Sequence, residues 1–245
     1  MEKVLVVGMG HVGRALAEII EGCSKYDLQT TDITHKEIVR PIDVMHICFP
    51  YSNQFDRDVT RYIDWYEPKL TLIESTVKPN TTQKIFHKTG VNLCHSPVRG
   101  NHSEGLVKGL RTYTKFIGPI RYQDGLLAEE YYNSLGLSTV ICSSPLETEF
   151  MKLLETSYSA LMIAYFQEIR RLCDKFGVNE AEIKHFFLTN TLESNFKHMR
   201  PVCYPSLIGG HCLLDNLAIL NKTYPMKLVA AIVESNNRRA APSDQ

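Results

Sequence analysis

The sequence lacks an excess of charge of either sign, and it lacks an apolar run long enough to cross a membrane. Its 245 residues include 27 basic and 27 acidic side chains, so the formal net charge is zero. This balance argues against a nucleic-acid or membrane-surface protein, which a basic field would mark. No apolar run approaches the roughly 20 residues of a transmembrane helix, and a strand pattern begins without a preceding secretory segment. We expect a cytoplasmic protein.

The sequence also lacks paired cysteines. Seven cysteines are scattered along the chain, and none forms a CxxC pair. An odd number without pairing argues against a disulfide framework, so most cysteines are expected to be small core residues. Residues 198–212 include four possible metal ligands, His198, Cys203, His211 and Cys212. Their spacing fits no standard zinc pattern. We therefore expect no metal.

The first stretch of the chain carries a dinucleotide-binding pattern. Residues 4–7 are apolar in succession, which is typical of a strand buried on both faces. Gly8-Met9-Gly10-His11-Val12-Gly13 follows and leads into a helical pattern over 14–20. Gly8 permits a tight turn, Gly10 lets the backbone approach a pyrophosphate, and Gly13 lets the helix lie close to the strand. The N–H groups and positive dipole end of the helix would then face the phosphates.

Asp32 follows the glycine pattern, after a second strand pattern over 26–31. A carboxylate at this place accepts a hydrogen bond from the adenosine ribose 2′-hydroxyl and repels a 2′-phosphate. The sequence therefore predicts NAD rather than NADP as the cofactor. The alternative that stays open is a doubly wound domain whose glycine turn binds nothing.

Strand and helix patterns alternate over residues 1–144. They predict an α/β domain with a mostly parallel, doubly wound sheet of the Rossmann type. Further strands are expected over 43–50, 70–74, 91–94, 113–117 and 138–142, and further helices over 53–66 and 125–134. A polar loop is expected from Arg99 to Arg111.

A second, smaller all-α domain is predicted over residues 145–245. Ser144, Pro145 and Glu147 form a helix-start signal, and one long helical pattern continues to Phe176. Helices are also expected over 180–188, 214–221 and 225–238, with an irregular stretch over 189–207. Residues 160–166 of the long helix are apolar on every side, so more than one neighbour must cover them. We expect this domain to form a homodimer.

Six motifs follow one another along the chain. They are GMGHVG at 8–13, ICFP at 47–50, ESTVKPNTT at 74–82, SPV at 96–98, the helix over 149–169 and GGHC at 209–212. In this order they resemble the nucleotide-sugar 6-dehydrogenases, the UDP-glucose and GDP-mannose dehydrogenase family. The resemblance implies a Rossmann domain that binds NAD, a helical domain that dimerises, and a third, nucleotide-binding domain. We expect that third domain to be absent, because the chain ends shortly after the last matched helix.

The resemblance also implies a reaction and a set of site residues. The family oxidises an alcohol carbon to a carboxylate in two NAD-dependent steps, through a cysteine-bound thiohemiacetal and thioester. Cys212 matches the cysteine, Lys152 matches a helix lysine that stabilises oxyanions, and Thr76 matches a threonine that orients water beside the nicotinamide. Their chemistry suits these roles. The other cofactor-binding residues implied in the matched motifs are Pro50, Tyr51 and Ser75.

Several positions depart from the family pattern. Val98 stands where the family has a glutamate, and Thr156 where it has an asparagine. Asp215 and Asn216 replace a Lys-Asp pair, so Asn216 is the candidate at the position of a catalytic acid. An asparagine cannot accept a proton at neutral pH as a carboxylate can. His102 and Glu104 lie nearby in sequence as candidate replacements.

Three functions stay open. The first is an NAD-dependent dehydrogenase acting on a nucleotide sugar or a related hydroxylated metabolite. The second is a catalytically degenerate NAD-binding protein that serves as a dimeric regulator or scaffold, which the departures favour. The third is a β-hydroxyacid dehydrogenase, which shares the two-domain plan but does not use GGHC.

Each candidate catalytic residue also has a purely structural interpretation. Cys212 would be an inert buried thiol, and Lys152 would be a surface lysine with a buried stem. Thr76 would cap the following helix, and Asn216 would be the N-cap of the next helix.

Overall fold

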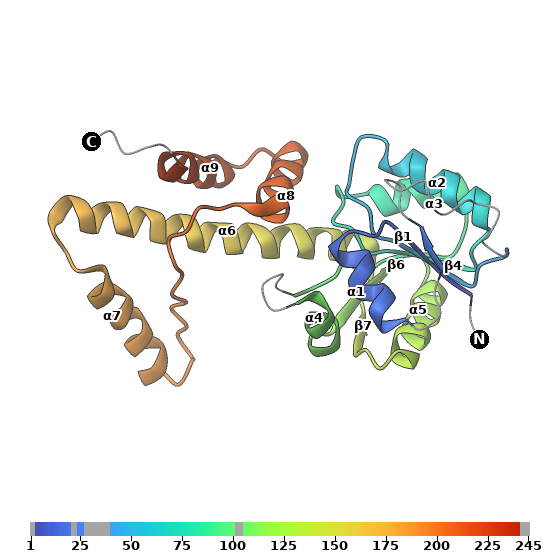
Figure 1. Cartoon of the computed structure of the whole chain (residues 1–245), viewed down its shortest axis with the longest axis horizontal. Helices are drawn as coiled ribbons and strands as arrows, with labels where there is room; N and C mark the ends of the chain where they lie inside the picture. Colours follow the sequence, from blue (N-terminus) through green and yellow to red (C-terminus); the bar gives the residue numbers. More distant parts are fainter. Residues whose placement is uncertain (1–2, 21–23, 27–39, 101–104, 241–245) are drawn as a thin grey trace. The chain divides into compact units, whose positions relative to one another are not determined.

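The structure is a computed structural model that describes residues 3–20, 24–26, 40–100 and 105–240, with the side chains of 24–26, 210–212 and 239–240 left outside the description. Backbone contacts divide the chain into two compact units, Met1–Lys152 and Leu153–Gln245. The division falls within the long helix α6, Pro145–Phe176 (Figure 1). The domain boundary is predicted earlier, after residue 144 and directly before the first residue of this helix, whereas the division by contacts follows Lys152.

The described part of the first unit contains a seven-stranded sheet with the order β2-β1-β3-β4-β5-β6-β7. The strands are β1 Val4–Val7, β2 Ser24–Tyr26, β3 Val44–Ile47, β4 Leu70–Ile73, β5 Leu93–His95, β6 Lys115–Pro119 and β7 Thr139–Ile141. Neighbouring strands are parallel except β5 and β6, which are antiparallel. The predicted mostly parallel α/β sheet is confirmed.

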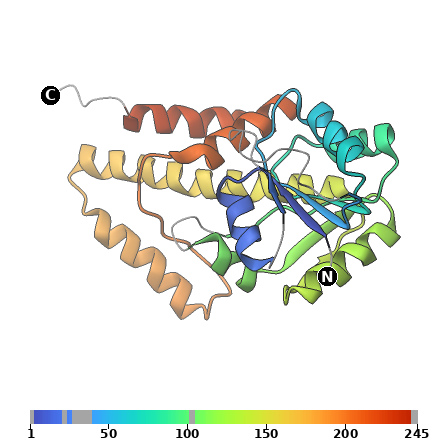
Figure 2. The same ribbon diagram turned by 45° about the vertical axis from the view of Figure 1, so that its right-hand side comes forward.

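Helices cover both faces of this sheet (Figures 1 and 2). They are α1 His11–Ile19, α2 Phe55–Tyr66, α3 Thr81–Thr89, α4 Leu106–Thr112 and α5 Tyr122–Ser134. Successive side chains of a strand point to opposite faces. Val4 and Val6 of β1 accordingly pack with α1, α4 and α5, whereas Leu5 and Val7 pack with α2 and α3. This arrangement explains why residues 4–7 are apolar without alternation.

Some predicted boundaries are wrong. Helix α4 occupies the second half of the polar loop predicted from Arg99 to Arg111. Leu106 and Leu110, one turn apart, are its buried contacts, and two apolar residues are too few to reveal a helix by periodicity. Helix α7, Glu180–Glu193, extends beyond the predicted end at 188. The predicted strand 26–31 begins within β2, and residues 27–31 lie outside the described part.

The second unit is helical where the structure describes it. It consists of α6 from Leu153 onward, α7, α8 Gly210–Thr223 and α9 Lys227–Ala240. The apolar face of α6 from Leu153 to Ala164 packs with α8 and α9, and Phe166, Ile169 and Cys173 pack with α7. The predicted long helix is confirmed. None of the described helices combines the length and apolar character that crossing a lipid bilayer requires.

Candidate functional site

Two glycines of the turn between β1 and α1 are required by the packing of the chain itself. Gly8 has a φ of +95°, and a β-carbon there would lie 2.7 Å from the backbone nitrogen of Phe49. A β-carbon on Gly13 would lie 1.9 Å from the carbonyl oxygen of Gly8. No side chain fits at these distances, so strand and helix can meet only through glycine.

Gly10 has a different reason to be glycine. It is the N-cap of α1 with an extended backbone that other residues also adopt. A β-carbon on Gly10 would meet no described atom within 4 Å. Neither strain nor packing among the described residues demands glycine here. The open space beside it fits the close approach of a pyrophosphate.

The start of α1 is suited to an anion. Within the described residues, Gly10 supplies no side-chain cap, and the first turn contains no acidic residue. The N–H groups at a helix start can donate to phosphate oxygens. His11 and Val12 lie in this first turn, and the carbonyl of Met9 accepts a hydrogen bond from Arg14 Nε at 2.8 Å. Sequence reasoning missed Arg14, whose guanidinium adds a positive charge at the turn.

The carboxyl ends of three neighbouring strands form one edge with this turn. The register aligns Val7 with Ile47 and Ile47 with Ile73, the last residues of β1, β3 and β4. The segments that follow β3 and β4 carry the predicted cofactor residues Pro50, Tyr51, Ser75 and Thr76. The Ser75 hydroxyl is buried and donates to the carbonyl of Phe49 at 2.6 Å, which joins these two segments. In open α/β sheets, ligands bind at this edge where the strand order reverses, here between β1 and β3. Asp32 lies outside the described residues.

His95 links the segment after β4 to helix α6. Its fully buried ring approaches the Ser75 carbonyl through Nε2 at 3.0 Å and the Thr148 hydroxyl of α6 through Nδ1 at 2.8 Å. Burial lowers the pKa of His95 to about 4, although the hydrogen bond to Ser75 raises it in part. The ring is therefore neutral at physiological pH. Nε2 donates to the Ser75 carbonyl, which leaves Nδ1 to accept from Thr148.

A charged cluster lies under the same edge. The carboxylate of Glu74 accepts from Lys115 Nζ at 2.5 Å, from the Tyr132 hydroxyl at 2.7 Å and from His46 Nδ1 at 2.9 Å. Lys115 also donates to the Ser96 carbonyl at 2.6 Å. Burial raises the pKa of Glu74, but the attraction of Lys115 and the hydrogen bond with His46 outweigh burial and lower this pKa from 4.5 to about 2. Because these side chains are shielded from solvent, the cluster fixes the strand ends and cannot touch a substrate directly.

The structural interpretations of two candidate residues are wrong. Helix α3 begins at Thr81 with Asn80 as its N-cap, so Thr76 does not cap it. Helix α8 begins at Gly210 with Gly209 as its N-cap, so Asn216 lies within the helix and does not start it. Their catalytic roles stay predictions.

Three of the four departures from the family pattern, Val98, Thr156 and Asn216, are buried, whereas Asp215 is exposed. Val98 is part of the apolar cluster around α1, α4 and α5. In the second unit, Asn216 donates from Nδ2 to the Thr156 hydroxyl at 3.3 Å, and both residues are buried. The two departing residues therefore bind each other, which joins α8 to α6.

The remaining candidates are placed only in part. Lys152 is half-buried on α6 in the first unit. The backbone of Cys212 lies in the first turn of α8 in the second unit, and its side chain is outside the description. His102 and Glu104 also lie outside it. Among the described side chains, no group of three or more His, Cys, Asp or Glu could hold a metal ion.

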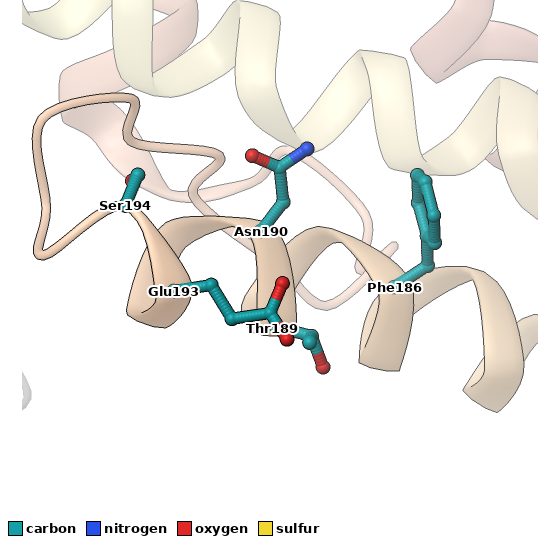
Figure 3. Close-up of a pocket in the computed structure, with 5 residues that line it drawn as sticks. All are labelled: Phe186, Thr189, Asn190, Glu193 and Ser194. Atoms are coloured by element: carbon teal, nitrogen blue, oxygen red, sulfur yellow. The ribbon is translucent and has the colours of Figure 1, made fainter.

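An open depression on α7 does not match any predicted site. Figure 3 shows that its lining comes from α7 and the residue that follows it: Phe186, Thr189, Asn190, Glu193 and Ser194. The Ser194 hydroxyl is already engaged with the Thr191 carbonyl at 2.9 Å. A single carboxylate and an engaged hydroxyl on one exposed helix do not form a catalytic group.

The fold and the glycine turn define a Rossmann-type dinucleotide-binding fold, with a helical unit after the sheet. Residues 146–238 match the family described as "UDP-glucose/GDP-mannose dehydrogenase family, central domain". The second half of the chain thus matches the central domain of the UDP-glucose/GDP-mannose dehydrogenase family.

Individual relatives agree with this assignment. The UDP-N-acetyl-D-mannosamine dehydrogenase of Methanococcus vannielii is 31% identical over 182 residues, covering 72% of this chain and 40% of the relative. That of Methanococcus maripaludis is 29% identical over 293 residues, covering 98% and 66%. The structure of the UDP-D-ManNAc dehydrogenase of Pyrococcus horikoshii has a TM-score of 0.79 at 20% identity, covering 96% of this chain and 68% of that one. The two sequence matches thus span 40% and 66% of the relatives' lengths.

Proposed function

We propose that the chain binds NAD at the carboxyl edge of its sheet and takes part in oxidising an alcohol carbon of a nucleotide sugar. The observation that carries the proposal is the open space at Gly10, where no described atom would meet a β-carbon, at the start of a helix whose N-cap makes no side-chain capping bond. Nothing in the described packing requires glycine there, whereas a bound pyrophosphate does. Residues 1–144 are the proposed NAD-binding domain, and residues 145–245 the proposed helical domain.

The substrate follows from the family and its relatives. The two curated relatives above are named for UDP-N-acetyl-D-mannosamine. This nucleotide sugar is therefore the first compound to test, followed by UDP-glucose and GDP-mannose, which name the family.

The roles of the side chains follow the family chemistry. Bound NAD supplies the hydride acceptor. The charge of Lys152 stabilises oxyanions formed at the reacting carbon. Loss of one hydride to NAD and of the hydroxyl proton would turn the alcohol into an aldehyde. The sulfur of Cys212 would then add to the aldehyde carbon, and loss of a second hydride to a second NAD would leave a thioester on this sulfur. The position of Cys212 in the first turn of α8 favours the thiolate, because the helix dipole is positive there. Thr76 orients the water that breaks the carbon–sulfur bond and releases the carboxylate.

Release of the product is the step that the departures weaken. Val98 lies in an apolar cluster, and the Asn216 amide is bound to Thr156. Neither can take the proton from the attacking water, and general-base catalysis is typically worth roughly 10²–10⁴-fold. The proposed enzyme therefore turns over slowly. The same observation favours a second candidate function, a dimeric regulator or scaffold that binds NAD without turnover.

A pair of glycine variants tests NAD binding. Gly10→Ala adds a methyl group to open space, so the melting temperature should stay within about 2 °C while the affinity for NAD falls at least about tenfold. Gly13→Ala places the same methyl group against the Gly8 carbonyl and should unfold or strongly destabilise the protein. Calorimetric titration with NAD and thermal unfolding measure both effects. Unchanged NAD affinity in Gly10→Ala, or no NAD binding by the unaltered protein, contradicts the proposal.

Turnover separates the two functions. Purified protein with NAD and the three nucleotide sugars should form NADH. If the protein binds NAD but forms no NADH with any of the three nucleotide sugars, the result supports the regulator or scaffold instead. NAD should also bind more tightly than NADP, and Asp32→Ala should narrow this preference, because the carboxylate repels a 2′-phosphate.

We also propose that the helical unit forms a homodimer in the cytoplasm. A stripe of large apolar side chains on α6 is about half exposed, formed by Leu154, Tyr158, Tyr165 and Leu172. The spacing places them near one helix face, and Phe186 and Leu192 of α7 are also exposed. Covering such a surface favours a second copy of the chain. A monomer by light scattering at micromolar concentration would contradict this.

A further inference from the structure

The carboxylate of Glu149 is buried in the second turn of α6 and reaches the chain near the start of α3. One oxygen accepts from the backbone N–H of Asn80 at 2.6 Å. The other accepts from the backbone N–H and the hydroxyl of Thr82, at 2.9 and 2.7 Å. Three donors thus converge on one carboxylate that solvent does not reach.

Helix α3 depends on this carboxylate for its cap. Its N-cap Asn80 has a left-handed backbone with a φ of 71°, and its own side chain makes no capping bond. The first N–H groups of a helix need acceptors, and a negative charge there is favourable to the helix dipole. Glu149 meets both needs from a distant part of the sequence.

The first turn of α6, directly before Glu149, is closely packed. At Gly118 of β6, a β-carbon would lie 2.3 Å from the Thr148 hydroxyl and 2.6 Å from the Pro145 α-carbon. The first turn of α6 therefore packs directly on the sheet. Thr148 also binds His95, which holds the Ser75 carbonyl.

The segment between β4 and α3 is consequently held at both ends. At its start, Ser75 is tied to Phe49 and His95. At its end, Asn80 and Thr82 are tied to Glu149. Thr76 lies between these two attachments.

The strand order determines which half of the cofactor this segment would meet. The pyrophosphate belongs over the turn after β1, and the adenosine ribose belongs on the side of β2. The other half of the dinucleotide then extends toward the ends of β3 and β4. Resting on the proposed function, we propose that Glu149 is a positioning residue that sets the 75–82 segment against the nicotinamide half of NAD without touching the cofactor.

The variant Glu149→Gln tests this proposal, because it removes one of the two acceptor oxygens of the side chain. A glutamine can offer its one oxygen either to Asn80 or to Thr82, and its NH₂ group then faces a donor. The matched control is Glu147→Gln, the same change two residues earlier at an exposed position of α6. Two probes are used, NAD and ADP-ribose, which lacks the nicotinamide. Glu149→Gln should weaken NAD about fivefold or more, as expected for the loss of roughly one hydrogen bond, and should change the ADP-ribose affinity less than about twofold.

Backbone amide hydrogen exchange gives an independent measurement. The amide protons of Asn80 and Thr82 should exchange faster in Glu149→Gln than in Glu147→Gln, with β1 and β3 unchanged. Thr82→Val removes only the hydroxyl donor and should give a smaller effect of the same kind, which Thr82→Ser should restore.

The outcomes separate the two proposals. If the unaltered protein binds neither NAD nor ADP-ribose, the proposed function fails. If it binds both, and Glu149→Gln weakens the two probes equally or neither, the role of Glu149 is purely structural and this inference is overturned. The inference is supported if Glu149→Gln weakens the binding of NAD but not of ADP-ribose, and if Thr82→Val shows a smaller effect of the same kind that Thr82→Ser does not show.

Discussion

The stability of the protein should decrease as the pH falls from about 7 to about 5, and His95 should be a main cause. The buried imidazole has a pKa of about 4 against an ordinary 6.5. Between these values the unfolded chain binds a proton that the folded chain excludes. The free energy of unfolding is therefore undiminished above pH 6.5 and decreases as the pH falls through the window toward pH 4.

The magnitude follows from the size of the shift. A difference of about 2.5 units corresponds to about 3 kcal/mol when the titration is complete. Between about pH 7 and about pH 5 the expected loss is about 2 kcal/mol. Lys115 and Glu74 act on His95 with opposite signs. Glu74 itself titrates below its ordinary 4.5 and so outside this window.

His95→Gln removes the titration and keeps a donor for the Ser75 carbonyl. Chemical denaturation across the pH range should give a curve for this variant that is flatter by about 2 kcal/mol, although the variant is less stable at neutral pH. His87→Gln is the matched control, because His87 is exposed on α3. Glu149, whose pKa burial raises, changes stability in the opposite direction but is common to all three proteins.

Two results would refute this reasoning. One is an unaltered pH slope in His95→Gln. The other is an NMR titration in which the His95 imidazole takes up its proton near pH 6.5 while the protein is still folded.

The remaining predictions concern packing, charge and chemistry. Gly118→Ala should destabilise the protein by about 1–3 kcal/mol in thermal unfolding, because the added carbon meets Thr148 and the helix backbone; a neutral effect would mean that α6 is not tightly packed there. Lys115→Met should cost about 3–5 kcal/mol by leaving Glu74 without its cation, and adding Glu74→Gln should recover part of that loss; equal stabilities of the single and double variants contradict the pairing. In stopped-flow measurements with an active nucleotide sugar, a burst of at most a few equivalents of NADH should precede slow turnover, and Cys212→Ala should abolish the burst without weakening NAD binding; fast turnover with no burst would exclude a slowly hydrolysed thioester.

The sequence was sufficient to predict those elements whose residue patterns are local. The apolar run of β1 with its glycine turn, and the start signal of α6 at Pro145, involve residues close together in the chain, so the sheet class and the long helix are confirmed. The short helix α4 was missed because its stability comes from Leu106 and Leu110 packing against a distant part of the unit. The spacing of apolar residues along the sequence contains no information on such long-range contacts.

The buried polar clusters could not have been predicted for a similar reason. His46 lies in β3, Lys115 in β6 and Glu74 directly after β4, and Glu149 meets Asn80 across 69 positions of sequence. The one available signal is the presence of titratable residues in or beside apolar runs, as His46 in β3. Such a residue indicates a buried partner but does not say which residue it is. The direction of β6, antiparallel to β5, was also beyond prediction, because a strand pattern contains no information on direction.

The glycines of the first turn would be lost at different rates in descendants of this protein. Gly8 and Gly13 are required by steric contacts of the polypeptide with itself, so they persist as long as the protein folds. Gly10 is under no such requirement among the described residues, and only a ligand would keep a side chain away from it. A lineage that stopped using the cofactor would retain the outer glycines and lose the middle one. The state of position 10 alone would then distinguish descendants that still use the cofactor from those in which only the fold survives.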